Sequence, residues 1–448
     1  MTTDSAIQTY PFATPTPLPL SATFDGGQLT SDGGLPWLAE ADTRLGLCAA
    51  LAACIPEWRT RTGQHALVTL VRQRVLQIAC GYAGQDDADT LRRGPLLKPV
   101  CGRLPESGRD LASQPTLSRL ENAADRRACH QLAYALLAIY LQERAREGAP
   151  THLVLDLDST DDPTHGRQEG AAYHGYYRQH MYHPLLVFDG ETGQLITAIL
   201  RPGNAHASQG VVAVLKRLLP RLRAQWPGVT IELRADGGFA SPELYTFCEA
   251  EQVGYTIGLV PNACLTALAA PLVAEAQQQQ AASADPTTEK VRLAGDGVYQ
   301  AGSWERRRRV VYKAEALPGG PNTRFVVTTR TDEPLALYDW YVDRGEAEGW
   351  IKDFKRACQA DRLSCQRCCA NQFRLFLHAA AYWLLDTLRR WLTRLGQPRL
   401  QLDTLRLQVL KIGGRVREWA SHVQLRLASS HPGQALWALL ARHPAVHE

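Results

Sequence analysis

The sequence lacks the marks of a secreted or membrane-spanning protein. Its 11 cysteines follow no disulfide-like spacing, and its beginning carries no signal-peptide pattern. The most apolar run, residues 373–392, is interrupted by arginine, histidine and aspartate, which is typical of a buried helix and not of a membrane span. We therefore expect a soluble protein in a reducing, cytoplasmic compartment.

Signals for two common kinds of site are also missing. The chain has no glycine-rich phosphate-binding loop, which disfavours nucleotide hydrolysis. Cys365, Cys368 and Cys369 have metal-like spacing, but a structural zinc site needs a second ligand pair at a suitable distance, and none is evident. The formal net charge of +4 is too small to demand a nucleic-acid partner by itself.

The length and periodicity predict several domains. A chain of 448 residues exceeds one ordinary hydrophobic core, so two or more domains are expected. Residues 1–150 begin with a proline- and threonine-rich stretch and then follow helical periodicity, which predicts a mostly helical N-terminal domain. Nothing in this domain fixes a chemistry, and it is compatible with recognition of DNA ends as well as with dimer contacts.

The pattern changes at residue 151. Residues 151–261 contain apolar β-type runs joined by short turns, and these runs then alternate with two helical stretches. This order predicts the first part of a mixed α/β sheet flanked by helices. Residues 331–400 are helical and are expected to complete this core.

Residues 262–330 and 401–448 stand apart from the core. The first segment has β-type runs around a Pro-Gly-Gly-Pro turn and is predicted to form a β-rich insertion subdomain. Within it, Arg306–Arg309 alternate along a predicted strand, which suits either contact with a DNA backbone or a solvated hairpin. The second segment is a C-terminal tail with no informative pattern.

Three aspartates lie where predicted strands end. Asp156 and Asp158 are two residues apart on one strand and so face the same side. Asp236 ends the run VTIELRAD and is followed by two glycines that permit a sharp turn. Acids at strand ends can converge on one sheet edge, where a divalent cation would relieve their repulsion. Each aspartate taken alone is more often a turn or cap residue.

A further group of polar residues lies in YVDRGEAEGWIKDFK. On an ideal helix Tyr341, Arg344, Glu348 and Lys355 project within about 60° of one another, beside an apolar arc that can pack into a core. This face would present one acid flanked by bases and a phenol. The alternative is a solvated face with an i,i+4 ion pair between Arg344 and Glu348.

The spacing of these four residues resembles the signature around the last acid of the insertion-sequence 4 superfamily of transposases. The text from RGEAEGWIKDFK through ANQFRLFLHAAAYWLL, preceded in order by LDLDST, LRPGN and LRADGGFASPEL, is similar to the insertion-sequence 1380 family within it. The resemblance covers about residues 20–430. It implies a ribonuclease-H-like fold, in keeping with the predicted order of strands and helices.

The resemblance also implies a site and an activity. The activity is that of a DDE transposase, which cleaves phosphodiester bonds at the ends of its element and joins the 3′-OH ends to target DNA by two-metal transfer. Asp158, Asp236 and Glu348 would be the catalytic acids and the ligands of Mg²⁺, with Mn²⁺ as a substitute, and Asp156 competes for the first place. The implied DNA contacts are Tyr341, Arg344 and Lys355.

The implied partners are the terminal inverted repeats and target DNA, bound by a homodimer in the bacterial cytoplasm near the nucleoid. Two other functions stay open. One is a catalytically inactive, transposase-derived DNA-binding protein, and the other is a ribonuclease-H-like nuclease without strand transfer. A cleavage assay with divalent metal and a strand-transfer assay with pre-cleaved ends would separate them.

Overall fold

The computed structural model describes residues 8–13, 15–16, 18–59, 63–283, 290–317 and 319–442. The chain divides into two compact units, the first made of residues 1–53, 57–120 and 384–448 and the second of residues 54–56 and 121–383. This division differs from the domain boundaries expected from the sequence, because periodicity identifies a helix without identifying the core on which it packs.

The first unit is mostly helical. Its helices are α1 (Leu35–Leu45), α2 (Leu47–Ala53), α3 (Leu67–Ala79), α4 (Asp87–Leu91), α5 (Leu97–Val100), most of α6 (Gln114–Ala123), α14 (Leu402–Leu405) and α15 (Gln434–Leu440). Its strands are β1 (Tyr10–Phe12), β2 (Leu20–Ala22), β3 (Leu29–Thr30), β15 (Gly414–Glu418) and β16 (Val423–Leu427). Gly46, at φ 62°, ends α1 in the left-handed conformation that glycine adopts without strain.

The last part of the chain is built into this unit. β15 pairs antiparallel with both β16 and β3, and the backbone N–H of Gly33 donates to the carbonyl of Ile412 over 2.8 Å. The described residues of the segment 401–448, which was expected to be a C-terminal tail, therefore belong to the first unit. Strand pairing between residues almost 400 positions apart leaves no local signal in the sequence.

The second unit is built on a large mixed sheet. Its strands, in spatial order, are β12 (Val291–Tyr299), β13 (Arg308–Leu317), β14 (Gly320–Thr328), β11 (Gly254–Leu259), β10 (Thr230–Ala235), β4 (His152–Ser159), β8 (Leu185–Asp189) and β9 (Leu195–Ile199). β4, β10 and β11 run parallel, and the other neighbouring pairs are antiparallel. The mixed α/β architecture predicted from the sequence is confirmed.

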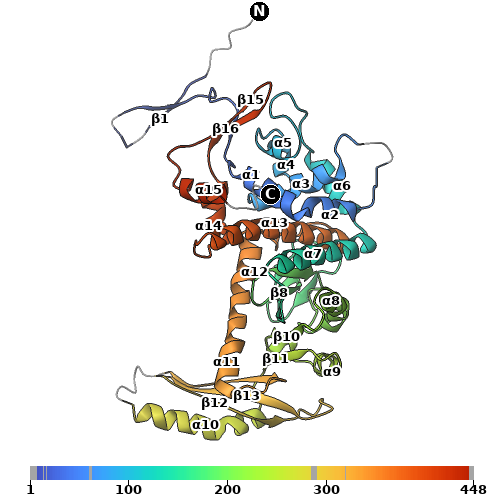
Figure 1. Ribbon diagram of the computed structural model, residues 1–448, viewed down its shortest axis with the longest axis vertical. Coiled ribbons are helices and arrows are strands. Elements are labelled where there is room, and N and C mark those ends of the chain that lie inside the picture. Colours follow the sequence, from blue (N-terminus) through green and yellow to red (C-terminus); the bar gives the residue numbers. More distant parts are fainter. Residues whose placement is uncertain are drawn as a thin grey trace, which may run out of the picture. The chain divides into compact units, whose positions relative to one another are not determined.

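Helices come before, between and after the strands of this sheet in the sequence. They are α7 (Arg126–Arg146), α8 (Val211–Gln225), α9 (Pro242–Ala250), α10 (Ala263–Ala281), α11 (Pro334–Val342), α12 (Glu346–Arg356) and α13 (Cys368–Arg394), whose last turns belong to the first unit. α7 packs on β9, and α9 packs on β11. α11 and α12 follow one another closely (Figure 1), and together with the short turn between them they carry the four polar residues singled out in the sequence.

The structure corrects the expectation for residues 262–330. This segment begins with the 19-residue helix α10, and its strands continue the main sheet through the pairing of β14 with β11. The alanine- and glutamine-rich composition of α10 favours a helix, and the Asn262 side chain caps it by accepting from the N–H of Leu265 at 3.0 Å. α10 packs against β12 and β13, so that it covers the extension of the sheet.

A small second sheet lies between β4 and β8 in the sequence. Its strands are β5 (Asp162–Pro163), β7 (Gln179–Tyr182) and β6 (Ala172–His174), in that spatial order. Across the described ranges, no helix combines the length and apolarity needed to cross a membrane.

Candidate active site

Asp158 and Asp236 lie side by side at one edge of the main sheet. β4 and β10 are parallel neighbours, and their last paired residues are Leu157 and Ala235. The next residue in each segment is the aspartate, with Asp158 still in β4 and Asp236 directly after the end of β10. The two aspartates therefore follow strand positions that lie about 4.8 Å apart. One oxygen of each carboxylate is held locally, in Asp158 by the N–H of Ser159 at 2.7 Å and in Asp236 by the N–H of Gly238 at 2.9 Å.

Arg344 connects this edge to Glu348. Its Nη1 lies 3.2 Å from Oδ2 of Asp158, and its Nη2 lies 3.6 Å from Oε1 of Glu348. The Glu348 side chain is 73% exposed, whereas that of Asp158 is 12% exposed. The structure thus brings a buried acid, a half-buried arginine and an open acid into one cluster.

The charges of this cluster interact. Burial raises the pKa of Asp158 to about 6, and the charges of Asp236 and Glu348 contribute to the rise while Arg344 opposes it. Burial alone would lower the pKa of Arg344, but Tyr341 and the three acids outweigh it and raise this pKa. A single guanidinium therefore lies within the field of all three predicted acids.

The helix that carries Glu348 differs from the one predicted. A 3₁₀ turn over Asp343–Gly345 separates α11 from α12. Tyr341 therefore lies in the last turn of α11, Arg344 in the 3₁₀ turn, and Glu348 in the first turn of α12. The ideal 100° spacing therefore does not hold across this stretch. The apolar arc does pack inward, because α12 buries Ala347, Trp350 and Phe354.

Tyr341 and Lys355 both have protein partners. The Tyr341 hydroxyl donates to the carbonyl of Ala235 at 3.1 Å, directly before Asp236. The Lys355 ammonium lies 2.6 Å from Oδ1 of Asp161 and not beside Glu348. Tyr341 therefore supports the end of β10 just before Asp236, and Lys355 links α12 to the loop that follows β4.

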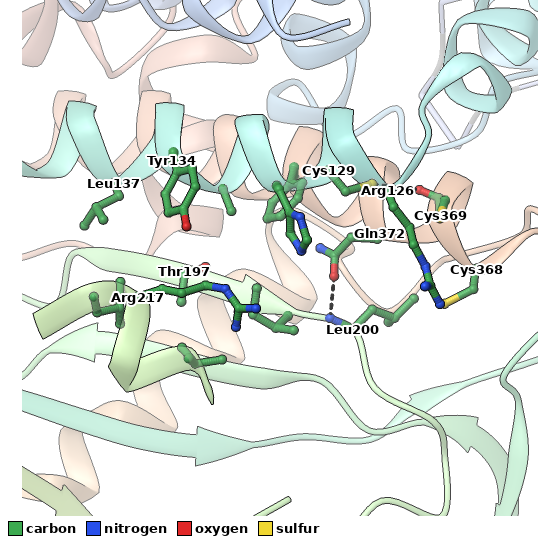
Figure 2. A pocket seen from close by; sticks show the side chains of 16 residues that line it. Arg126, Cys129, Tyr134, Leu137, Thr197, Leu200, Arg217, Cys368, Cys369 and Gln372 are labelled. Carbon is green, nitrogen blue, oxygen red and sulfur yellow. Dashed lines mark hydrogen bonds between the residues drawn. The ribbon is translucent and has the colours of Figure 1, made fainter. Parts of the chain in front are cut away.

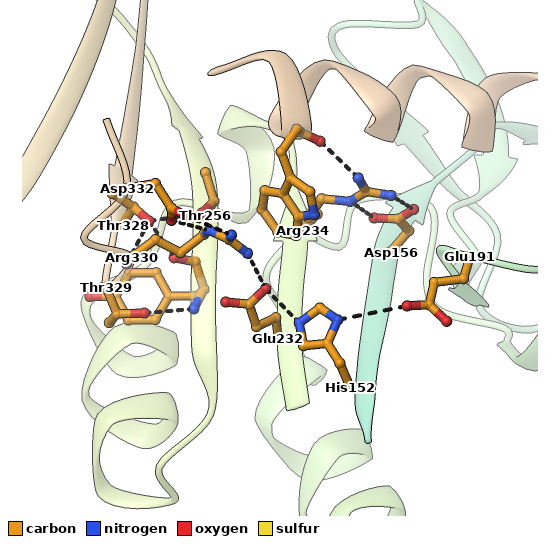
Figure 3. A network of polar contacts seen from close by, with 12 residues as sticks. His152, Asp156, Glu191, Glu232, Arg234, Thr256, Thr328, Thr329, Arg330 and Asp332 are labelled. Carbon is orange, nitrogen blue, oxygen red and sulfur yellow. Dashed lines mark hydrogen bonds and ion pairs between the residues drawn. The ribbon is translucent and has the colours of Figure 1, made fainter. Parts of the chain in front are cut away.

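Asp156 occupies a different environment from Asp158. Its two carboxylate oxygens accept from Nε and Nη2 of Arg234 at 2.7 and 2.8 Å, and the carboxylate is fully buried (Figure 3). Arg234 also donates to the carbonyl of Trp340 at 2.8 Å and lies 4.9 Å from the centre of its ring. Asp156 thus serves as one half of a closed ion pair.

Comparison with known proteins adds a family to this geometry. The sequence profile described as transposase DDE domain group 1 matches residues 15–444. The chain belongs to this family. A cryo-electron microscopy structure of the piggyBac transposase synaptic complex with hairpin DNA is similar, with 12% identity and a TM-score of 0.41 over 85% of this chain and 79% of that one. No curated protein matches the sequence.

The donor set of this DDE transposase domain suits a hard divalent cation, because carboxylate oxygens are the preferred ligands of Mg²⁺. Burial is the main cause of the raised pKa of Asp158, and the negative charges of Asp236 and Glu348 add to it. In the structure Arg344 supplies the balancing positive charge. Among the described residues, no group of three or more His, Cys, Asp or Glu side chains is arranged to hold a metal ion.

Two residues of the site were not anticipated from the sequence. A Cβ added to Gly258 of β11 would lie 2.8 Å from the N of Gly237 and 2.9 Å from the Tyr341 hydroxyl, so only glycine allows this approach. Arg234 was not recognised as the partner of Asp156. The parallel pairing of β4 with β10 places the two opposite each other, but a register between distant strands is not visible in the sequence.

The arginine run 306–309 leads into β13, and three of its side chains pair with acids of the protein. Arg306 and Arg308 both pair with Glu249, with the Arg308 Nε at 2.8 Å, and Arg309 pairs with Asp296 at 2.8 Å. Arg308 is buried, which excludes it as a surface contact.

A cavity of about 370 Å³ lies elsewhere in the second unit, among α7, α8, β9 and α13 (Figure 2). Its wall is largely apolar, and Arg126 and Arg217 are among the residues that line it. Gln372 closes one side by accepting from the N–H of Leu200 at 2.7 Å. None of the predicted acids or their neighbouring bases lines this cavity.

Proposed function

We propose that the chain is a transposase that binds the ends of its own insertion sequence, cleaves a phosphodiester bond there and joins the freed 3′-OH to target DNA. The observation that carries the proposal is the position of Asp158 and Asp236 at one sheet edge, with Arg344 and Glu348 beside them. The family match over residues 15–444 supports it.

In this proposal the three acids hold Mg²⁺, or Mn²⁺ in its place. The ions would activate the attacking oxygen and stabilise the leaving oxygen of phosphoryl transfer. Asp158 and Asp236 form the rigid part of the ligand set, because each is fixed by a backbone N–H of its own turn. Glu348 is the adjustable part, because its side chain is exposed on the first turn of α12.

Arg344 has two tasks in the proposal. Without DNA it neutralises Asp158 and Glu348, which would otherwise repel each other. When DNA and ions are bound, its guanidinium is free to hold a phosphate oxygen. Tyr341 positions the turn that carries Asp236, and Lys355 supports the DNA side of α12 through Asp161.

The finer assignments belong to the same proposal. We infer a ribonuclease-H-like core, membership of the insertion-sequence 1380 group within the insertion-sequence 4 superfamily, and a homodimer that brings two element ends together. Asp158 is preferred to Asp156 as the first acid because Arg234 already engages both oxygens of Asp156.

The test uses the full-length protein and duplexes taken from the DNA that flanks its gene. Cleavage at an end should require Mg²⁺ or Mn²⁺, and pre-cleaved ends should be joined to a plasmid. Glu348→Gln should abolish both reactions and leave end binding intact, because binding rests on other contacts.

Glu346→Gln is the matched control, since Glu346 is exposed in the same turn of α12 and makes no contact with Arg344 among the described residues. Cleavage without joining would indicate a nuclease. End binding without cleavage by the wild type would indicate an inactive DNA-binding protein. Equal activity of the Glu348→Gln and Glu346→Gln variants would remove Glu348 from the site.

A further inference from the structure

The hairpin of β6 and β7, residues 172–182, is unusually rich in exposed aromatic and basic side chains. Tyr176 at its turn is 84% exposed, and Tyr173 is 55% exposed. Arg178 and His180 are exposed as well. The hairpin contains no aspartate or glutamate, so its surface offers aromatic rings and positive charge without a competing acid.

The hairpin is anchored to the helix of the candidate site. Asp161 accepts from Gln179 of β7 through Oδ2 at 3.1 Å and pairs with Lys355 of α12 through Oδ1 at 2.6 Å. The Tyr177 ring packs against His174 and His183, with ring centres 5.0 and 6.1 Å away. The base of the turn is therefore fixed, while Tyr176 extends into solvent.

The turn lies close to the candidate acids. Burial raises the pKa of Tyr177, and the carboxylates of Asp161, Asp158 and Asp236 add to the rise. These interactions place the Tyr177 hydroxyl within the field of two of the three acids. Asp161, which bonds both Gln179 of the hairpin and Lys355 of α12, links the same turn to the helix that carries Glu348.

Arg178 occupies an unfavourable backbone conformation. Its φ is 55°, in the left-handed region that residues other than glycine, asparagine and aspartate adopt uncommonly. Its N–H closes the turn on the carbonyl of His174 at 2.8 Å. Its guanidinium has no carboxylate partner among the residues that the structure describes.

We propose that the β6–β7 hairpin binds the DNA strand beside the candidate acids, with the Tyr176 ring stacked on an unpaired base and the Arg178 guanidinium on a phosphate. Aromatic rings beside basic groups are the usual means of binding single-stranded nucleic acid. The inference rests on the proposed function, since it places the contacts next to the bond to be cut.

The first experiment compares two fluorescent probes of the same sequence, one a blunt duplex and the other forked with six unpaired nucleotides. The wild type should prefer the fork. Tyr176→Ala should reduce this preference roughly fivefold or more, because stacking on one base is lost. Tyr176→Phe is the matched control and should keep the preference, because it retains the ring.

The second experiment addresses Arg178 in a salt titration. Arg178→Asn removes the charge and suits the left-handed conformation, so the fold should be unaffected. It should weaken binding of both probes and reduce the slope of log K against log salt by about 0.7–0.9. Arg178→Lys keeps the charge and should keep the slope. Thermal melting of each variant verifies that the fold is intact.

The outcomes separate this inference from the proposed function. If the wild type cleaves element ends but Tyr176→Ala and Arg178→Asn bind both probes as the wild type does, the hairpin inference is wrong. If these variants instead change only self-association in sedimentation, the hairpin is a protein interface and the inference is also wrong. If the fork preference depends on Tyr176 while the wild type cleaves no DNA, the inference stands and the proposed function fails.

Discussion

Asp156 and Asp158 lie two residues apart on one face of β4, and their surroundings differ sharply. Asp156 is fully buried, and both its oxygens are engaged by a guanidinium that is itself held by the Trp340 carbonyl and ring. Asp158 is at the strand end, where Arg344 contacts one oxygen and Glu348 stands open to solvent.

The difference shows how one strand can serve both stability and function. The interior pair is closed, because both charges are buried and each neutralises the other. Removing either partner would leave the other as an unpaired buried charge. The cluster at the edge is open, because its arginine and its glutamate can move without exposing the core. A site that must accept a cation and a phosphate needs the second arrangement.

The largest expected effect comes from exchanging the functional acid. Asp158→Asn should reduce cleavage of element ends by at least about a hundredfold, because a ligand charge is lost where phosphoryl transfer needs it. End binding and the melting temperature should change little. A gel-based cleavage assay and thermal melting measure activity and stability in parallel. Near-normal cleavage by this variant would show that Asp158 is not a functional acid.

The second effect concerns the closed pair. Asp156→Asn should destabilise the protein by about 3–5 kcal/mol, because Arg234 is left as an uncompensated buried charge. Denaturant unfolding of the full-length protein measures this. Replacing both partners, with Asp156→Leu and Arg234→Met, should recover part of the stability. Loss of cleavage with unchanged stability would instead make Asp156 the metal-binding acid.

Two glycines offer a matched test at the two places. A Cβ at Gly190 would lie 2.7 Å from Oδ2 of Asp156, and a Cβ at Gly258 would lie 2.8 Å from the N of Gly237. Gly190→Ala and Gly258→Ala should each cost about 1–3 kcal/mol through overpacking. Only Gly258→Ala should also impair cleavage, because it displaces the turn that carries Asp236. Equal cleavage by both variants would argue against a role for that turn.

The residues in these tests differ in how far the sequence alone could predict their positions. Local periodicity predicts the strands β4, β10 and β11, their place in a mixed sheet and the inward face of α12. The structure contains all of these. The ion pair of Asp156 with Arg234, the close approach at Gly258 and the pairing of β14 with β11 depend on register between distant strands. Periodicity within one segment contains no information about such register.

The polar face of residues 341–355 shows a subtler limit. The ideal helix predicted one continuous surface, and a 3₁₀ turn at Asp343–Gly345 divides it. Gly345, a weak helix former, lies at this break. The break changes which acids the basic residues contact. Arg344 contacts Asp158, whereas Lys355 contacts Asp161.

The last expected effect appears only as a change with pH and concerns Asp162, another acid near the site. Its carboxyl is buried, and neither oxygen has a hydrogen-bond partner among the described residues. Burial raises its pKa to about 8, with Asp361 and Asp161 adding to the rise and Lys355 and Arg374 opposing it. The folded protein therefore keeps this proton up to about pH 8, whereas the unfolded chain releases it near the ordinary value of about 3.9.

The sign of the pH dependence follows from the protons bound. Between about pH 4 and 8 the folded state binds more protons at Asp162 than the unfolded state, so its contribution to stability falls as pH rises. Wild type should lose up to about 1.4 kcal/mol of stability per pH unit relative to Asp162→Asn, which cannot titrate. Thermal melting of both proteins from pH 5 to 8 measures this difference. Asp361→Asn should lower the pKa of Asp162 and so narrow the pH range over which stability falls. Parallel curves for wild type and Asp162→Asn would show that the pKa of this carboxyl is not raised in the folded protein.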